Sequence, residues 1–358
     1  MHRDRSQQRS QHRTGRRGAT AALRPAALRL PNPHAPRRLR LLTTPPMPII
    51  GEDPMPAETT FTLQTWNVWY GGREVDFGQE KQYAIAAQFP ADILALQECW
   101  GSAAEKLAPK LLADLAQRGW DTGVLSTGQL TAVDTSTQPY AQAALVRPLP
   151  DSPRVLVWSV HLAPYPYAVY RALQGEGQEV ADAEEAPRLQ QIEDILSETA
   201  RICDEVDEAD LPVVICGDFN TPSTGDWAAR TDRPDIAWRS PDALLSAGFT
   251  DTFRAIHPDP VAAPADTWSP IEPLTHAGHE EKPEPGRTDG AEPRDRIDFI
   301  FSRGLDIIDS VVRGCSAESR EEDGFVDVGG RCELIPNQRQ NRFPSDHQLV
   351  ETRFAFRG

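Results

Sequence analysis

The chain has 358 residues, 39% of them hydrophobic, and a formal net charge of −16 at pH 7. That much apolar material can bury the core of one large α/β domain or two average ones, which excludes a protein that is disordered throughout. No stretch approaches the roughly 18 consecutive apolar residues of a membrane span, so we expect a soluble body with no transmembrane segment.

Charge is distributed unevenly along the chain. The first fifty residues contain eleven Arg and one acid, Asp4, a balance of +10 that leaves a net charge of −26 on the rest. Proteins that hold nucleic acid along its backbone use Lys and Arg to neutralise phosphates. The acidic remainder therefore disfavours a long nucleic-acid footprint. It is compatible with a small phosphate ester, because bound divalent cations would supply positive charge locally.

Residues 1–58 are predicted to be a disordered, Arg/Pro-rich N-terminal extension. The pair Arg16-Arg17 resembles part of a twin-arginine export signal, but Arg24 and Arg29 interrupt the apolar region that should follow it. The sequence does not decide the compartment, although this interruption favours the cytoplasm over export. Translated upstream sequence, with the true start at Met47 or Met55, is the alternative explanation of this segment.

From Thr59 onward the predicted elements alternate between strands and helices. In the first half they are a strand over 61–68, a helix ending at Gln88, a strand over 92–98 and a helix over 103–118. In the second half they are a strand over 154–161, a helix over 182–206, a strand over 212–217, a surface loop over 255–294, and strands over 296–301 and 349–356. The alternation predicts one α/β domain over residues 59–358.

Polar residues stand where these strands end, which is where α/β proteins place their ligands. They are Asn67, Gln97-Glu98, His161, Asp218, Asn220, Asp298 and Asp346-His347. Taken singly, each has an ordinary explanation as a cap, a turn residue or a buried histidine. Together they are carboxylates, carboxamides and imidazoles with no nucleophilic Ser or Cys among them. This set suits oxygen-preferring cations such as Mg²⁺ or Mn²⁺ and hydrolysis by an activated water.

Six blocks around these residues resemble, in order and spacing, the motifs of the endonuclease/exonuclease/phosphatase superfamily. The blocks are Thr65-Trp66-Asn67-Val68, Leu96-Gln97-Glu98, Ser159-Val160-His161-Leu162, Gly217-Asp218-Phe219-Asn220, Arg296-Ile297-Asp298-Phe299-Ile300 and Ser345-Asp346-His347. The resemblance spans residues 59–358 and implies a catalytic domain of the α/β (α+β) class. That fold is a four-layered sandwich of two mixed β-sheets flanked by helices.

The resemblance also implies a role for each residue. The predicted ligands of Mg²⁺ or Mn²⁺ are Glu98, Asn67 and Asp346. Catalytic roles fall to Asp218, which would orient or deprotonate the attacking water, and to Asn220, which would hold that water or a phosphate oxygen. His161, and His347 oriented by Asp298, would stabilise charge on the phosphoryl group. Trp69 stands where apurinic endonucleases have an acidic residue, which disfavours that repair activity.

Two further residues are candidates for substrate binding. Tyr167 belongs to an aromatic segment with Tyr165 and Tyr170 that supplies either a hydroxyl to the phosphate or a wall for the leaving group; simple packing of a loop is the other reading. Arg188 lies on the long predicted helix and either points toward the site or stays solvated.

Other metal-ligating residue types do not form a second site. The five Cys include no CxxC pair, which argues against zinc, and Cys315 and Cys332 would bridge only in an oxidising compartment. His276, His279, Glu280 and Glu281 have no supporting pattern around them and are read as a solvated loop.

The sequence thus predicts a metal-dependent hydrolase of a small or lipid-linked phosphodiester or phosphomonoester. A nuclease of the same family is the first alternative, with nucleic acid as its partner, and it would need a basic groove. A catalytically silent binding module is the second alternative. No protein partner is indicated.

Overall fold

The computed structural model describes residues 60–206, 208, 210–268, 293–315, 324–328 and 338–357. The predictions for the N-terminal extension, for residues 276–281 and for Cys332 lie outside these residues. Cys315 is disulfide-bonded, whereas Cys99, Cys203 and Cys216 are free. In the described part of the chain no helix is long and apolar enough to cross a membrane.

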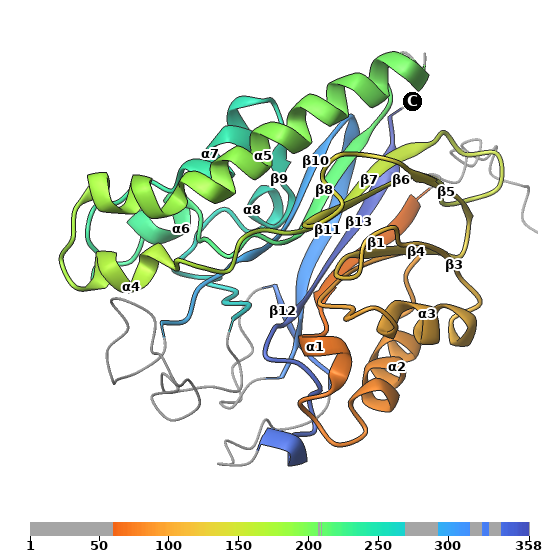
Figure 1. The fold of residues 1–358 in the computed structure, drawn as a ribbon, viewed down its shortest axis with the longest axis horizontal. Helices are drawn as coiled ribbons and strands as arrows, with labels where there is room; N and C mark the ends of the chain where they lie inside the picture. Colours follow the sequence, from red (N-terminus) through yellow and green to blue (C-terminus); the bar gives the residue numbers. More distant parts are fainter. Residues whose placement is uncertain are drawn as a thin grey trace, which may run out of the picture. The chain divides into compact units, whose positions relative to one another are not determined.

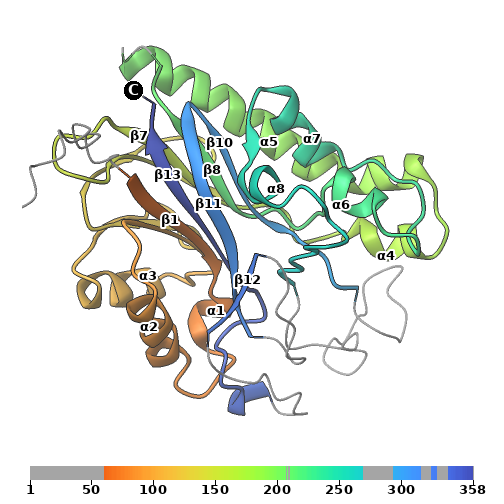
Figure 2. The same ribbon diagram turned by 180° about the vertical axis from the view of Figure 1, so that it is seen from behind.

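The described strands form two mixed sheets (Figures 1 and 2). The first sheet has the order β12-β11-β13-β1-β2-β4-β3, with β1 Thr60–Asn67, β2 Ile93–Gln97, β3 Asp114–Ala116, β4 Gly123–Ser126, β11 Leu305–Gly314, β12 Phe325–Asp327 and β13 Leu349–Phe356. The second has the order β5-β6-β7-β8-β10-β9, with β5 Gln129–Val133, β6 Ala141–Arg147, β7 Val155–His161, β8 Val213–Asp218, β9 Thr250–Asp251 and β10 Asp298–Arg303.

The two sheets pack face to face. Phe61, Leu63 and Ile93 of the first sheet share one buried cluster with Val157 and Val214 of the second. Side chains alternate along a strand, so the neighbours of these residues point to the opposite faces, where they are also buried. Strands buried on both faces read as continuous apolar runs, which is why the central strands could be recognised from the sequence.

Helices cover the two outer faces. Ile85 of α2 (Gly78–Gln88) and Leu107 of α3 (Ala103–Leu107) pack on the outer face of the first sheet. Ile195 of α5 (Gln178–Val206) and Leu244 of α7 (Arg239–Ser246) pack on the outer face of the second. The remaining helices are α1 Trp69–Gly72, α4 Ala168–Leu173, α6 Thr224–Ala228 and α8 Thr252–Ile256, with 3-10 turns at Ala108–Lys110 and Gln338–Gln340. Helix, sheet, sheet and helix make four layers, so the predicted fold class is confirmed.

One predicted element is wrong. The helix expected over 103–118 ends at Leu107 and is followed by a 3-10 turn that contains Pro109 and by strand β3. Proline cannot donate the helical hydrogen bond, and its ring clashes with the preceding turn, so the helix cannot continue through this position. The chain therefore turns here and returns as an edge strand of the first sheet.

Strand register brings the predicted polar residues to one end of the sandwich. In the parallel pair β1 and β2, Asn67 lies opposite Gln97, one residue before Glu98. In the parallel pair β7 and β8, His161 lies opposite Asp218, and β10 places Asp298 opposite the same Asp218. Hydrogen bonding between neighbouring strands thus sets these side chains beside one another.

The inter-layer packing predicts a contrast between two leucines. Leu156 in β7 is 0% exposed, and truncation to Ala should lower the free energy of unfolding by about 2–5 kcal/mol, because it leaves a cavity. Leu112 is 88% exposed, so the same substitution there should change it by less than about 0.5 kcal/mol. Urea unfolding followed by tryptophan fluorescence measures both. Equal losses would contradict the assignment of Leu156 to the core.

Candidate active site

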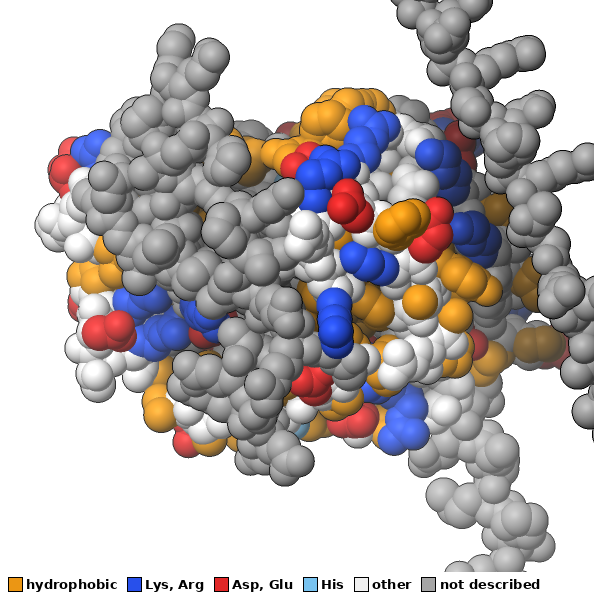
Figure 3. All heavy atoms as spheres, turned by 90° about the horizontal axis from the view of Figure 1, so that it is seen from below, with side chains coloured by type: hydrophobic (Ala, Val, Ile, Leu, Met, Phe, Trp, Pro, Cys, Tyr) orange, Lys and Arg blue, Asp and Glu red, His pale blue; other side chains and the backbone are white. Residues whose placement is uncertain are grey.

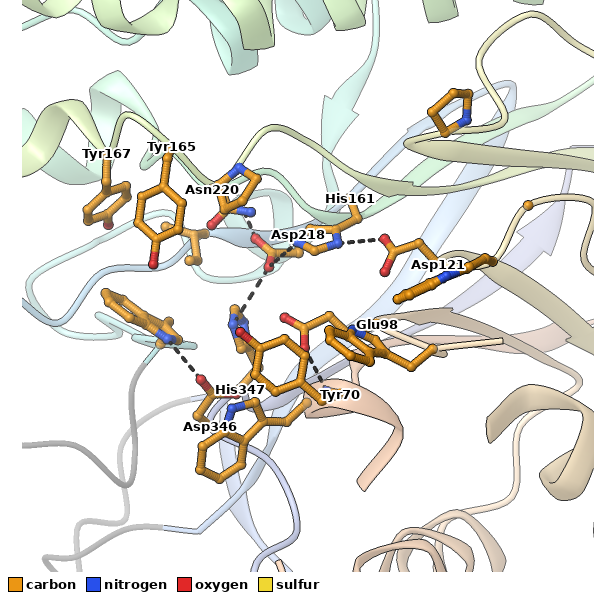
Figure 4. Close-up of a pocket in the computed structure, with 18 of the residues that line it drawn as sticks. Tyr70, Glu98, Asp121, His161, Tyr165, Tyr167, Asp218, Asn220, Asp346 and His347 are labelled. Atoms are coloured by element: carbon orange, nitrogen blue, oxygen red, sulfur yellow. Dashed lines mark hydrogen bonds and ion pairs between the residues drawn. The ribbon is translucent and has the colours of Figure 1, made fainter. Parts of the chain in front are cut away.

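A cavity of about 1070 Å³ opens where the strand-end residues meet (Figure 4). Seven of the ten residues predicted for the site line it: Glu98, His161, Tyr167, Asp218, Asn220, Asp346 and His347. Asn67 and Asp298 are fully buried directly behind this lining, in contact with it. Only Arg188 lies elsewhere.

Asp218 is the centre of the site. Its Oδ2 accepts a hydrogen bond from Asn67 Nδ2 at 3.0 Å, and its Oδ1 accepts one from the backbone of Asn220 at 2.9 Å. The Nε2 atoms of His161 and His347 lie 3.7 and 3.6 Å from the same Oδ2. Burial raises the pKa of Asp218, while the charge of His347 acts against this shift. A carboxyl group so placed has a higher proton affinity than an exposed one.

His347 is held by a buried carboxylate. Its Nδ1 lies 2.9 Å from Oδ2 of Asp298, and both side chains are shielded from solvent. Burial alone would lower the pKa of His347, but the charges of Asp298, Asp218 and Asp346 raise it well above its ordinary value. The predicted pairing of His347 with Asp298 is therefore present, and the imidazole is held in its cationic form.

His161 is held in the same way by Asp121, a residue that the sequence reasoning missed. Its Nδ1 lies 2.6 Å from Oδ2 of Asp121. Burial lowers the pKa of His161, but the hydrogen bond to Asp121 and the charges of Asp121, Asp218 and Glu98 raise it to about 9. Asp121 lies in the loop between β3 and β4, after a strand that the sequence did not predict and in no motif, so no sequence signal marked it.

Glu98 is positioned by an unusual backbone turn. The four residues of α1, Trp69 to Gly72, all have positive φ angles, between 46° and 75°. This turn directs the Tyr70 N–H to Glu98 Oε2 at 2.6 Å and the Gly71 N–H to the Glu98 carbonyl at 2.7 Å. Left-handed backbone costs roughly 1–2 kcal/mol per non-glycine residue, so surrounding contacts must hold it.

Asn67 bridges two carboxylates. Its Nδ2 donates to Glu98 Oε1 and to Asp218 Oδ2, both at 3.0 Å, and its Oδ1 accepts from the backbone of Trp69. Its amide oxygen is thus directed at the backbone. The structure adds a role that the sequence did not predict, since Asn67 links Glu98 to Asp218, and metal ligation by Asn67 stays a prediction.

Asp346 offers a free ligand atom beside Glu98. Its Oδ2 accepts from Trp268 Nε1 at 3.4 Å, whereas its Oδ1 is buried without a hydrogen-bond partner among the described residues. Burial and the negative charge of Glu98 raise the pKa of Asp346 to about 7, although His347 opposes this. A buried, unpartnered carboxylate oxygen near a second carboxylate fits a divalent cation, which takes oxygen ligands and would relieve their repulsion.

A second group of donor atoms fits a metal less well. One atom each from Asp218, Asp298 and His347 lie within 4.8 Å of one another. However, both ring nitrogens of His347 face carboxylate oxygens, and a protonated imidazole has no lone pair to offer a metal. The chemistry of these three residues therefore suits charge stabilisation, and that of Glu98 and Asp346 suits ligation.

Tyr167 and Arg188 were predicted to bind substrate. Both make hydrogen bonds to other groups of the protein. Tyr167 lines the cavity, and its hydroxyl donates to Asp295 Oδ2 at 3.1 Å. Arg188 is 0% exposed and donates to Glu185 and to the carbonyls of Pro164 and Pro166. The expectation that Arg188 reaches substrate or solvent is wrong, because its guanidinium holds the segment that carries Tyr165.

The family of the chain follows from these motifs and from the comparison with known proteins. The Endonuclease/Exonuclease/phosphatase family matches residues 65–347, which is most of the chain, and the chain belongs to this family. The resemblance predicted from the six motifs is thereby confirmed. Members of this family are hydrolases that act on phosphate esters.

Several individual proteins are similar to the chain. An uncharacterized Caenorhabditis elegans protein, F14F9.5, is 28% identical over 310 residues, which cover 82% of this chain and 91% of that protein. Truncated TDP2 from Caenorhabditis elegans has 16% identity and a TM-score of 0.49, covering 83% of this chain and 98% of that one. A family member from Bacteroides thetaiotaomicron has 14% identity and a TM-score of 0.49, covering 84% and 99%.

The His161–Asp121 pair predicts a shifted titration. In Asp121→Asn the His161 pKa should fall from about 9 by about one to two units, since a hydrogen bond to a charged group contributes roughly 1.5–3 kcal/mol. The imidazolium would then lose its proton at lower pH. NMR titration of the ring, assigned with His161→Gln, measures this. Asp306→Asn, at an exposed acid, is the matched control; an unchanged His161 titration in Asp121→Asn would refute the pairing.

The buried Arg188–Glu185 pair predicts a loss of stability. Arg188→Met would leave Glu185 buried without its cation and should lower the free energy of unfolding by about 3–5 kcal/mol. Arg201→Met removes a partly exposed arginine from comparable i,i+3 and i,i+4 pairs and should cost no more than about 1 kcal/mol. Chemical denaturation compares the two. Similar losses would mean that burial of the pair is not what makes Arg188 important.

Proposed function

We propose that this protein is a divalent-metal-dependent hydrolase of small or lipid-linked phosphate esters, which uses in-line attack by water. One observation carries the proposal: two imidazoles, each held by its own carboxylate, direct Nε2 toward the same oxygen of Asp218. Asp218, a proton acceptor, thus lies between two cationic imidazoles. The acids Glu98 and Asp346 line the same cavity. Such an arrangement suits a reaction in which water is deprotonated while negative charge develops on a phosphoryl group.

Glu98 and Asp346 would hold the cation. Asp346 Oδ1 is unpartnered and buried, and Glu98 is fixed in place by the Tyr70 N–H and by Asn67. Bound Mg²⁺ or Mn²⁺ would supply positive charge that polarises the phosphoryl oxygens. Asn67 would keep Glu98 and Asp218 at a fixed separation, because one amide nitrogen donates to both carboxylates.

Asp218 would orient the attacking water and accept its proton. Burial raises the pKa of Asp218, which makes it a stronger base, and Asn67 and the Asn220 backbone hold its orientation. The water oxygen forms a bond to phosphorus while the bond from phosphorus to the leaving oxygen breaks. The proton that Asp218 takes up is balanced by one that the leaving group acquires.

His347 and His161 would stabilise the charge that develops. The anions Asp298 and Asp121 keep both imidazoles protonated, so each presents an N–H to the phosphoryl oxygens. Donors fixed in a buried site need no reorganisation when charge develops, which is the usual source of their large effect. Asn220, whose side chain donates to the Leu162 carbonyl, borders the same space.

The nuclease alternative is less well supported. On the described part of the face seen in Figure 3, Lys and Arg side chains are interspersed with acidic and apolar ones and do not form one continuous basic stripe. Within the cavity, the described lining residues include five acids and no Lys or Arg. A polynucleotide would therefore find few groups to neutralise its backbone. The binding-module alternative is disfavoured because every catalytic group that the motifs predict is present.

Hydrolysis by the full chain tests the proposal. Bis-p-nitrophenyl phosphate, sphingomyelin, inositol phosphates, DNA and RNA are offered with Mg²⁺, Mn²⁺, Ca²⁺ or EDTA. We expect cation-dependent turnover of a small or lipid-linked ester. Glu98→Gln and His347→Ala should each lower kcat by about 10²–10³-fold, because each removes stabilisation of transition-state charge.

His257→Ala is the matched control, since His257 lies outside the cavity lining and bonds the Ser310 carbonyl. Turnover of DNA alone would support the nuclease. If no substrate is hydrolysed with any cation, or if activity survives both site substitutions, the proposal fails.

A further inference from the structure

Three aromatic side chains form a concave corner in the cavity and take no part in the chemistry proposed above. The rings of Tyr70 and Trp100 meet at 72° with centroids 4.6 Å apart, and those of Trp100 and Trp120 meet at 56° with centroids 4.8 Å apart. Tyr70 and Trp120 remain 40% and 49% exposed.

A free carboxylate lines the same cavity as this corner. Glu74 lines the same cavity, and its carboxylate has no hydrogen bond or ion pair with the described residues. Unlike Glu98 and Asp121, Glu74 has no catalytic or pairing role to explain its place in the cavity.

The charge of the cavity favours a cationic group. Five acids line it, namely Glu74, Glu98, Asp121, Asp218 and Asp346, and no Lys or Arg is among the described lining residues. Two imidazolium groups and one divalent cation would offset about four of these charges, which leaves no surplus for a polyanion. Outside the lining, the exposed Arg73 lies with its guanidinium 5.6 Å from the Trp100 ring centroid and donates to the Trp100 carbonyl at 3.4 Å.

We propose that the corner of Tyr70, Trp100 and Trp120, together with Glu74, binds a quaternary ammonium group, so that the substrate is a choline-type phosphoester. The inference rests on the proposed function, which places the phosphate beside Asp218. Figure 4 shows Glu98 and Asp121 on one side of Asp218 and Tyr165 and Tyr167 on the other. The ammonium group would lie on the first side, where aromatic faces and carboxylates are combined. A cation over an aromatic face contributes about 0.5–2 kcal/mol.

Binding of two isosteres tests this directly. Phosphocholine and 3,3-dimethylbutyl phosphate have the same shape and the same phosphate, but only the first carries the positive charge. Calorimetric titration of the full chain with Mg²⁺ present should give a Kd at least about tenfold lower for phosphocholine, equivalent to 1.4 kcal/mol. Trp120→Leu and Glu74→Gln should each reduce this ratio severalfold. Phe77→Leu, at an exposed aromatic outside the cavity, should keep the wild-type ratio.

Equal affinities for the two isosteres in the wild-type protein would overturn the inference. A ratio that neither Trp120→Leu nor Glu74→Gln changes would do so as well, and circular dichroism shows whether each variant is folded. The rates of hydrolysis of glycerophosphocholine and of sphingomyelin in mixed micelles are then compared. Faster hydrolysis of the first indicates a free ester as substrate, and faster hydrolysis of the second indicates a lipid headgroup.

The two proposals fail separately. A charge-dependent binding ratio without hydrolysis of any ester would support the ammonium site and refute the proposed activity. Hydrolysis of esters with equal binding of the isosteres would support the activity and refute the ammonium site.

Discussion

The burial of the Asp218 carboxylate is the constraint on which the site depends. A buried anion is costly unless donors and cations surround it. Here the Asn67 amide, the Asn220 backbone and the imidazoles of His161 and His347 approach it from four different parts of the chain. Asn67 and His347 flank strands of the first sheet and Asp218 and His161 end strands of the second. The charge of one side chain is thus compensated only when the two sheets are correctly packed.

The same arrangement separates two kinds of charged group. Imidazoles held by Asp298 and Asp121 are cationic, while the acids Glu98 and Asp346 line the same cavity and interact electrostatically. Burial, with a smaller contribution from the charge of Glu98, raises the pKa of Asp346 to about 7. The cationic and the acidic groups therefore differ in what they can bind, since the imidazoles suit an anion and the two carboxylates suit a cation.

Residues outside the reacting centre shape the cavity. The left-handed turn of Trp69–Gly72 both holds Glu98 and presents the Tyr70 ring. On the other side, Arg188 holds the carbonyls next to Tyr165, and Asp295 holds the hydroxyl of Tyr167. The motif residues stand at strand ends, whereas these wall residues lie in the short helix α1, in α5 and in the segments between strands. Specificity is therefore expected to depend on the loops, as in other proteins that place binding residues on a rigid scaffold.

The sequence by itself determined the central strands, the polar residues at their ends and the family. These are local patterns, because apolar residues alternate along β1 and run continuously along β2 and β8, and the motif residues stand at or next to the ends of their strands. It did not predict β3, β4, β5, β6, β9, β11 or β12, or the end of α3 before Pro109. The edge strands β3 and β5 have partly exposed side chains and so carry a weak apolar pattern.

Only the tertiary structure decided how the side chains pair. Asp121 and His161 are 40 residues apart, and Asn67 and Asp218 are 151 apart, so their contacts exist only once the layers are packed. The same holds for Arg188, which a helical pattern left free to face the site or solvent and which packing directs into a buried ion pair. A periodic pattern in the sequence indicates which face of a helix or strand is apolar. The partner of a polar side chain depends on which other segment of the chain packs against it.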